Sequence, residues 1–148
     1  MAQTTLSGPL VLGDKQAGLA NSPTTGFVPC VQFVTIARDA TLVQNATIYL
    51  PKGSQITNIV PDVTVAYDSA TSATLSVGTA SAGTQYVSGV NAKTAGRAAP
   101  AYTAAQLTNM SAIGTNDVLV ATVTSVGQPT VGTIVLAVHY VQKASSTD

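Results

Sequence analysis

The side chains that most often carry out catalysis are few in this chain, and they stand well apart in its sequence. A hydrolase of the serine-triad type needs a nucleophile, a base and an orienting carboxylate. The one histidine, His139, is flanked by Val138 and Tyr140 in a long apolar segment near the carboxyl end. A histidine in such a strand pattern is typical of a packed or edge position, so we assign it no catalytic role.

The single cysteine, Cys30, follows a proline in the apolar segment Val28–Val31. Apolar surroundings disfavour the reactive thiolate, so we expect a structural role for this residue. One cysteine cannot form a disulfide within the chain. No Cys/His cluster has the spacing of a zinc site, and no Asp-x-Asp loop has that of a calcium site. We therefore expect neither a metal nor a cofactor.

The acidic residues are all aspartates, and they are scattered singly. Glycoside hydrolysis requires two carboxylates that face the sugar at a defined separation. The fold could bring any two of them together, but nothing in their spacing favours that reaction. We predict that the chain is not an enzyme and has no small-molecule substrate. The aspartates are Asp14, Asp39, Asp62, Asp68, Asp117 and Asp148.

Two further ligand classes find little support in the sequence. Residues 78–85 have the glycine spacing of a phosphate-binding loop but lack the lysine that would contact the phosphates, so we interpret them as a flexible loop. Sugar-binding sandwiches often stack rings on tryptophan or tyrosine, and this chain has no tryptophan and five tyrosines. Of these, Tyr67 and Tyr140 are expected to pack in the core.

The composition predicts the kind of scaffold that holds these residues. With 148 residues, of which 45% are hydrophobic, the chain can form one domain with a full core. Threonine occurs 22 times and valine 19 times, whereas glutamate is absent. β-Branched residues fit a pleated surface, and the residues that usually cover surface helices are scarce. These features predict an all-β domain.

The charge balance narrows the choice of partners. Six basic and six acidic residues give a formal net charge of zero, and without a basic run we expect no nucleic-acid partner. No apolar stretch reaches the roughly 18 residues of a membrane span, and the first residues lack signal-peptide features, so we expect synthesis in the cytoplasm.

Only 8% of the residues are charged, against about a quarter to a third of a typical soluble surface. We infer that other copies or a larger body cover much of this surface.

Residues 1–26 differ from the rest of the chain. Glycine and proline recur every few residues, which prevents a long helix or strand, yet apolar residues recur as well. We predict an extended N-terminal arm that becomes ordered by lying across a partner; the alternative is a loose terminus whose leucines have no role. The apolar residues of this arm are Leu6, Leu10, Val11, Leu12 and Leu19.

Short strand patterns fill the sequence from residue 27 to residue 143. Pro61 separates two of them, and in the second, residues 62–67, the side chains of Val63, Val65 and Tyr67 are predicted to share one face. A small, polar stretch over residues 88–100 is assigned no strand, and residues 102–110 are predicted to contain one short helix. The other predicted strands are 31–36, 47–50, 55–60, 74–78, 118–123 and 130–141.

The closing segment, residues 130–141, is almost continuously apolar, which is typical of a central strand buried on both faces. Seven to nine strands joined by turns predict a single β-sandwich, jelly-roll-like, over residues 27–143. Residues 144–148 are predicted to form a flexible C-terminal tail.

The order of five segments resembles small structural proteins of tailed bacteriophages that decorate or cement the capsid. These segments are Leu50–Thr57, Val63–Gly78, Gln85–Val87, Ala95–Arg97 and Gly132–Tyr140. The resemblance covers residues 45–141 and rests on turn placement and a Thr/Val-rich style. It implies a β-sandwich body, often trimeric, seated at junctions between capsomers.

The sequence and the resemblance together predict a non-enzymatic virion protein that binds the major capsid protein on the outer capsid surface, as a homotrimer, and stabilises the capsid. The alternative is a receptor- or glycan-binding module of a phage head or tail fibre, in which Tyr86 or Tyr102 would contact the ligand. The three basic residues in the set of predicted capsid contacts are expected to lie in turns. The set is Leu6, Leu10, Val11, Leu12, Leu19, Lys52, Lys93 and Arg97.

Overall fold

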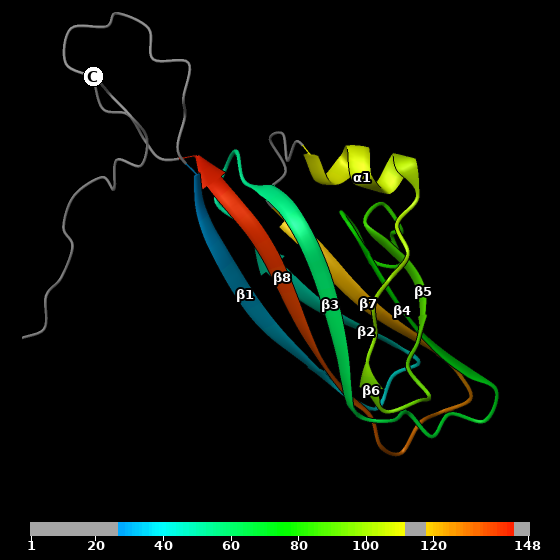
Figure 1. The fold of residues 1–148 in the computed structure, drawn as a ribbon. Helices are drawn as coiled ribbons and strands as arrows, with labels where there is room; N and C mark the ends of the chain where they lie inside the picture. Colours follow the sequence, from blue (N-terminus) through cyan, green and yellow to red (C-terminus); the bar gives the residue numbers. More distant parts are fainter. Residues whose placement is uncertain (1–26, 112–117, 144–148) are drawn as a thin grey trace, which may run out of the picture.

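Two four-stranded antiparallel sheets and one short helix form the computed structural model, which describes residues 27–111 and 118–143 (Figure 1). The β1 sheet has the strand order β1-β8-β3-β6, and the β2 sheet has the order β2-β7-β4-β5. The strands are β1 (Phe27–Ala37), β2 (Val43–Tyr49), β3 (Gln55–Val65), β4 (Ser72–Gly78), β5 (Val87–Asn91), β6 (Gly96–Arg97), β7 (Val118–Val126) and β8 (Thr133–Lys143).

The strand pairing follows a mirror order along the chain. β1 pairs with β8, β2 with β7, β3 with β6 and β4 with β5, all antiparallel. The first half of the chain thus forms a long hairpin with the second half, and successive pairs of this hairpin alternate between the two sheets. This is the arrangement of a jelly roll. The prediction of an all-β sandwich of this type is confirmed.

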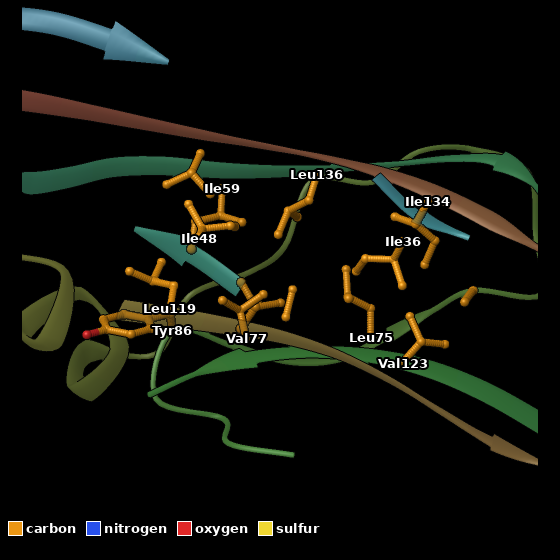
Figure 2. Packing of buried hydrophobic residues seen from close by; sticks show 14 of the residues in the cluster. Ile36, Ile48, Ile59, Leu75, Val77, Tyr86, Leu119, Val123, Ile134 and Leu136 are labelled. Carbon is orange, nitrogen blue, oxygen red and sulfur yellow. The ribbon is translucent and has the colours of Figure 1, made fainter. Parts of the chain in front are cut away.

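The core lies between the two sheets, where alternate side chains of each strand meet. Ile134, Leu136 and Val138 of β8 are fully buried. Ile134 and Leu136 face the side chains that the β2 sheet turns inward, among them Leu75 and Leu119 (Figure 2). β-Branched and leucine side chains at every second position fill the space between sheets about 10 Å apart. The period-two pattern of the sequence therefore decides which side of each strand is buried.

β3 is one continuous strand, so the prediction of two strands separated by Pro61 is wrong. Pro61 lies opposite Leu136 in the ladder with β8, and its carbonyl oxygen accepts a hydrogen bond from Ala98 N at 2.8 Å. In a strand, the nitrogen and the carbonyl of one residue point to the same side, so the Pro61 nitrogen faces the edge beside β6. A proline at such a position costs no ladder bond to β8.

The predicted common face of Val63, Val65 and Tyr67 is also wrong. The register with β8 shifts between Val63 and Val65, and this irregularity turns the next side chain outward. Val63 is buried, whereas Val65 is 45% exposed. Tyr67 lies beyond the end of β3, where its buried ring packs directly on Gly132; a Cβ at that glycine would lie 2.5 Å from the ring. The close approach explains why residue 132 lacks a side chain.

β8 is central in its sheet, as predicted, but the prediction that both its faces are buried is wrong for the described chain. Its inward residues are fully covered, while Val135, Ala137 and Val141 on the other face are half-buried and His139 is exposed. The polar stretch over residues 88–100, to which the sequence patterns assigned no strand, contains most of β5 and all of β6.

The predicted short helix is present as α1 (Ala104–Ser111), at the end of the sandwich where β8 finishes (Figure 1). A reciprocal cap begins it: Gln106 N donates to Thr103 Oγ1, and Thr103 N donates to Gln106 Oε1. This capping box satisfies two amide groups that the first turn would otherwise leave unpaired. No helix in the described parts of the chain is long and apolar enough to cross a membrane.

Two neighbouring residues of β8 test the assignment of inner and outer faces. Leu136→Ala empties a fully buried position and should lower the free energy of unfolding by about 2–5 kcal/mol. Val135→Ala removes less buried apolar area, because Val135 is half-buried on the outer face. It should lower the free energy of unfolding by about 1 kcal/mol or less. Urea titration monitored by circular dichroism measures both, and equal losses would contradict the assignment.

Candidate interaction face on the β1 sheet

The outer side of the β1 sheet is apolar. Along β1, every second side chain points away from the core, and these include Phe27, Val31 and Phe33, which are 46%, 43% and 68% exposed. Isolated exposed apolar residues are ordinary on proteins. Three at alternate positions of one strand form a row, which calls for a physical explanation.

The row continues across the sheet because the strands are in register. Phe33 lies opposite Ala137 of β8, which in turn lies opposite Val60 of β3, and Val31 lies opposite His139. We call this surface the apolar face; it comprises Phe27, Pro29, Val31, Phe33, Val60, Val135, Ala137 and Val141.

A shallow depression of about 220 Å³ lies in the middle of the apolar face. Asp62 and Arg97 form part of its wall, with an Arg97 Nη2 to Asp62 Oδ2 distance of 3.8 Å. The Arg97 side chain is 73% exposed, so this contact is loose and contributes little to stability. The residues that line the depression are Phe33, Val60, Asp62, Arg97, Val135, Ala137 and His139.

The outer side of the β2 sheet is more mixed. Six of its outward positions are threonine or serine, but Val43 and Tyr49 of β2 and Val118, Val120 and Val126 of β7 point outward as well. Thr122 Oγ1 donates to Asn45 Oδ1 at 2.7 Å and accepts from Ala82 N at 2.9 Å. We call this surface the hydroxyl face; it includes Thr47, Ser72, Thr74, Ser76, Thr122 and Thr124, with Val43 and Tyr49 at its β2 edge.

β1 forms one edge of its sheet. It pairs with β8 along all of its length, and within the described residues no strand lies on its other side. Its sequence, FVPCVQFVTIA, contains no charged residue. A long, uncharged edge strand is a site where another chain can pair or pack unless something covers it. The apolar face and this edge therefore form one continuous side of the molecule.

Several charged side chains form hydrogen bonds at the end of the sandwich where β1 finishes and β8 begins. The Asp68 carboxylate accepts hydrogen bonds from Thr130 N at 2.6 Å, from Thr130 Oγ1 and from Val131 N, and these bonds lower its pKa to about 2. Arg38 Nε donates to Pro129 O at 2.9 Å. These contacts tie three connections between strands together, and we call this the clamped end.

The structure separates the three predicted basic contacts. Lys52 is exposed in the turn between β2 and β3, at the end of the sandwich where β1 begins. Lys93 belongs to the clamped end, where its Nζ donates to Ser69 O at 2.7 Å and lies near two further carbonyls. Arg97 is in β6 and not in a turn as predicted. Arg97 pairs with Asp62, which lies seven residues along β3 from its first residue, Gln55, so at about 3.3 Å per strand residue Arg97 lies roughly 20 Å or more from the Lys52 turn. The three basic residues therefore do not form one patch.

The five predicted arm contacts, Leu6, Leu10, Val11, Leu12 and Leu19, lie outside the described residues. The residues of the apolar face were not among the predicted site residues. A signal for them was present, because the segment Phe27–Ile36 is apolar at both odd and even positions. A strand covered on one side only should alternate.

The groups that could do chemistry are not brought together. Cys30 is half-buried on the inward side of β1, and its Sγ lies 3.8 Å from Val28 O. His139 shares the depression with one carboxylate, that of Asp62. Within residues 27–111 and 118–143, no three His, Cys or Asp side chains are placed to hold a metal ion.

Four of the five tyrosines are occupied, and the fifth, Tyr49, is 69% exposed on the outer side of β2. Tyr67 and Tyr140 are buried, as predicted, and burial raises the pKa of Tyr67 to about 12, with the charge of Asp39 adding to the effect. Tyr86 is buried as well, and the Tyr102 hydroxyl accepts from Ile59 N at 2.9 Å. Neither Tyr86 nor Tyr102 offers a free ring on which a sugar could stack.

Comparison with known proteins supports the fold. No family model matches the chain, and no curated protein matches it. Among solved structures, the chain is similar to one in the structure titled "Cyanophage Pam1 capsid asymmetric unit", with a TM-score of 0.53 and 19% identity. The two share a fold. The match covers 95% of this chain and 97% of that one, so the likeness extends over nearly the whole of two chains of similar length.

Acid should remove the contribution of Asp68 to stability. Its pKa is lowered from 3.8 to about 2 in the folded protein, so its stabilising bonds are complete above the ordinary pKa and are lost as the pH falls toward 2. We expect Asp68→Asn to unfold at a lower urea concentration than the parent protein at pH 7, and the difference between the two proteins to shrink at pH 2.

Asp62→Asn is the matched control, because its carboxylate contacts only the exposed Arg97 across 3.8 Å. This variant should unfold close to the parent at pH 7. If the Asp68→Asn variant is destabilised relative to the parent by the same amount at both pH values, the loss of stability does not come from the carboxylate charge.

Proposed function

We propose that this chain is a non-enzymatic structural protein of a phage virion, which binds the outer surface of the capsid and stabilises it. The observation that carries the proposal is the apolar face, a mostly uncharged side that no other described part of the chain covers, on a jelly roll whose few reactive groups are dispersed. The fold likeness to a chain of a phage capsid structure supports the same conclusion. The proposed partner is the major capsid protein, and the proposed location is the capsid surface after synthesis in the host cytoplasm.

The proposed activity is adhesion without chemistry. A protein that bridges capsid subunits has to add contact area between them, and apolar area supplies a free energy of roughly 25 cal/mol per Å². Single contacts can be weak if several act together on one shell. We propose a homotrimer for this reason, since three copies joined together would engage the shell at three places.

The predicted contacts enter this proposal in two groups. The apolar residues of the arm, Leu6, Leu10, Val11, Leu12 and Leu19, would extend the contact to a neighbouring subunit, and the arm would become ordered on binding. Among the basic residues, Lys52 and Arg97 are exposed and can meet polar groups of a capsid. Lys93 is less suited, because its ammonium already donates to carbonyls of its own chain.

Capsid binding can be measured directly with undecorated capsids from the virus that encodes the chain. The purified protein should co-sediment with these capsids and raise the temperature at which they lose integrity. Because the apolar face carries few charges, binding should change by less than about threefold between 50 mM and 500 mM salt. Failure of the intact protein to bind the capsids would end the proposal.

Removing residues 2–20 tests the arm separately. The shortened protein should keep the fold of the sandwich, because the described core contains none of these residues. We expect it to bind capsids about tenfold more weakly and to protect them less against heat, since it lacks the five apolar arm residues. Unchanged binding would leave the capsid proposal standing and would remove the arm from it.

A further inference from the structure

We infer that the molecule has a fixed orientation on the capsid: the apolar face and the β1 edge seat against an uncharged, largely apolar patch of the capsid protein, and the hydroxyl face points to solvent. This inference rests on the proposed function, because it names the side of the protein that carries out the proposed binding.

The contrast between the two sheets is the first argument. Both outer faces carry exposed apolar side chains. On the apolar face Phe27, Pro29, Val31 and Phe33 follow one another along a single strand, whereas on the hydroxyl face Val43, Tyr49 and Val126 stand apart among serine and threonine residues. Water can form hydrogen bonds with exposed hydroxyl groups, whereas removing an apolar surface from water lowers the free energy. Of the two, the apolar face is therefore the one that a partner would cover.

The point where the arm joins the sandwich is the second argument. Phe27 begins β1 and is itself the first outward residue of the apolar face. The 26 residues before it can span up to about 90 Å when extended. A capsid surface in contact with the apolar face therefore lies within reach of the arm, and the arm leaves the sandwich at the border of that contact.

The size of the patch is the third argument, and it separates the capsid from a second copy as the occupant. Two phenylalanines and a valine, about half-exposed, leave an apolar patch on the order of 300–400 Å² with the smaller residues beside them. Each partner in a standard interface contributes about 800 Å². Two copies joined by this patch alone would bury too little for a stable dimer, whereas the proposed capsid contact also includes the arm.

Two double variants with matched exposure test the orientation. Phe33→Ser with Val31→Thr alters the apolar face at positions that are 68% and 43% exposed, and Tyr49→Ser with Val43→Thr alters the hydroxyl side at positions that are 69% and 43% exposed. All four side chains point outward from strands, so both variants should fold. Circular dichroism and thermal melting of the free proteins check this.

We expect the apolar-face variant to bind undecorated capsids at least about tenfold more weakly and the hydroxyl-side variant to bind within about twofold of the parent. In hydrogen exchange, amides of β1 should become protected on capsid binding while those of β2 stay unchanged. The reverse pattern, or equal losses in both variants, would overturn the orientation while leaving capsid binding itself established.

Two other occupants of the apolar face would be recognised in the same experiment. If Phe33→Ser with Val31→Thr dissociates an oligomer of the free protein in sedimentation velocity, the face joins copies of this chain and the inference is wrong. If deletion of residues 2–20 makes the β1 amides of the free protein exchange faster, the chain's own arm covers the face and the inference is wrong as well. A parent protein that does not bind capsids at all would refute the proposed function first.

Discussion

Burial of the inward side of β8 is the interaction on which the rest of the structure depends. This last strand pairs with the first strand, β1, and with β3, and its inward residues Ile134, Leu136 and Val138 are completely removed from water. The mirror-order pairing of the jelly roll closes only when β8 takes this place. A strand has two sides, however, and the sandwich covers only one of them. The outer side of β8, with Val135 and Ala137, therefore becomes the middle of the apolar face, and the fold and the candidate site share one cause.

Sequence patterns predicted the elements well where each strand had one covered side. The alternation within residues 74–78 indicated β4, the apolar, β-branched run 118–123 indicated β7, and composition alone indicated the all-β class. The predictions failed where neighbours along the chain do not decide the outcome. Pro61 is tolerated in β3 because β6 pairs with only two residues of that strand, and this depends on a segment more than thirty residues away.

Periodicity indicated apolar outward positions on β1 and β8, but it could not show that these positions are left uncovered, and the reason is physical. An apolar residue on the outer side of a strand gives the same pattern whether its own protein or a partner covers it. The continuous apolar run of β8 therefore predicted burial on both sides, and the structure shows an outer side that is only half-covered. The roles of the individual charged residues could not be read from the sequence either. The sequence gives the number of charged groups, but the hydrogen bonds of Asp68, Lys93 and Arg38 show that three of them hold loops of the clamped end.

Cys30 is the single cysteine of the chain, and its half-buried place on the inward side of β1 has a practical consequence. A new thiol on the hydroxyl face would be far more accessible to a maleimide dye. Thr124→Cys is suitable, because Thr124 is exposed on β7, on the sheet opposite β1. A fluorophore there would leave the β1 edge unobstructed. Copies on a single particle could then be counted from stepwise photobleaching.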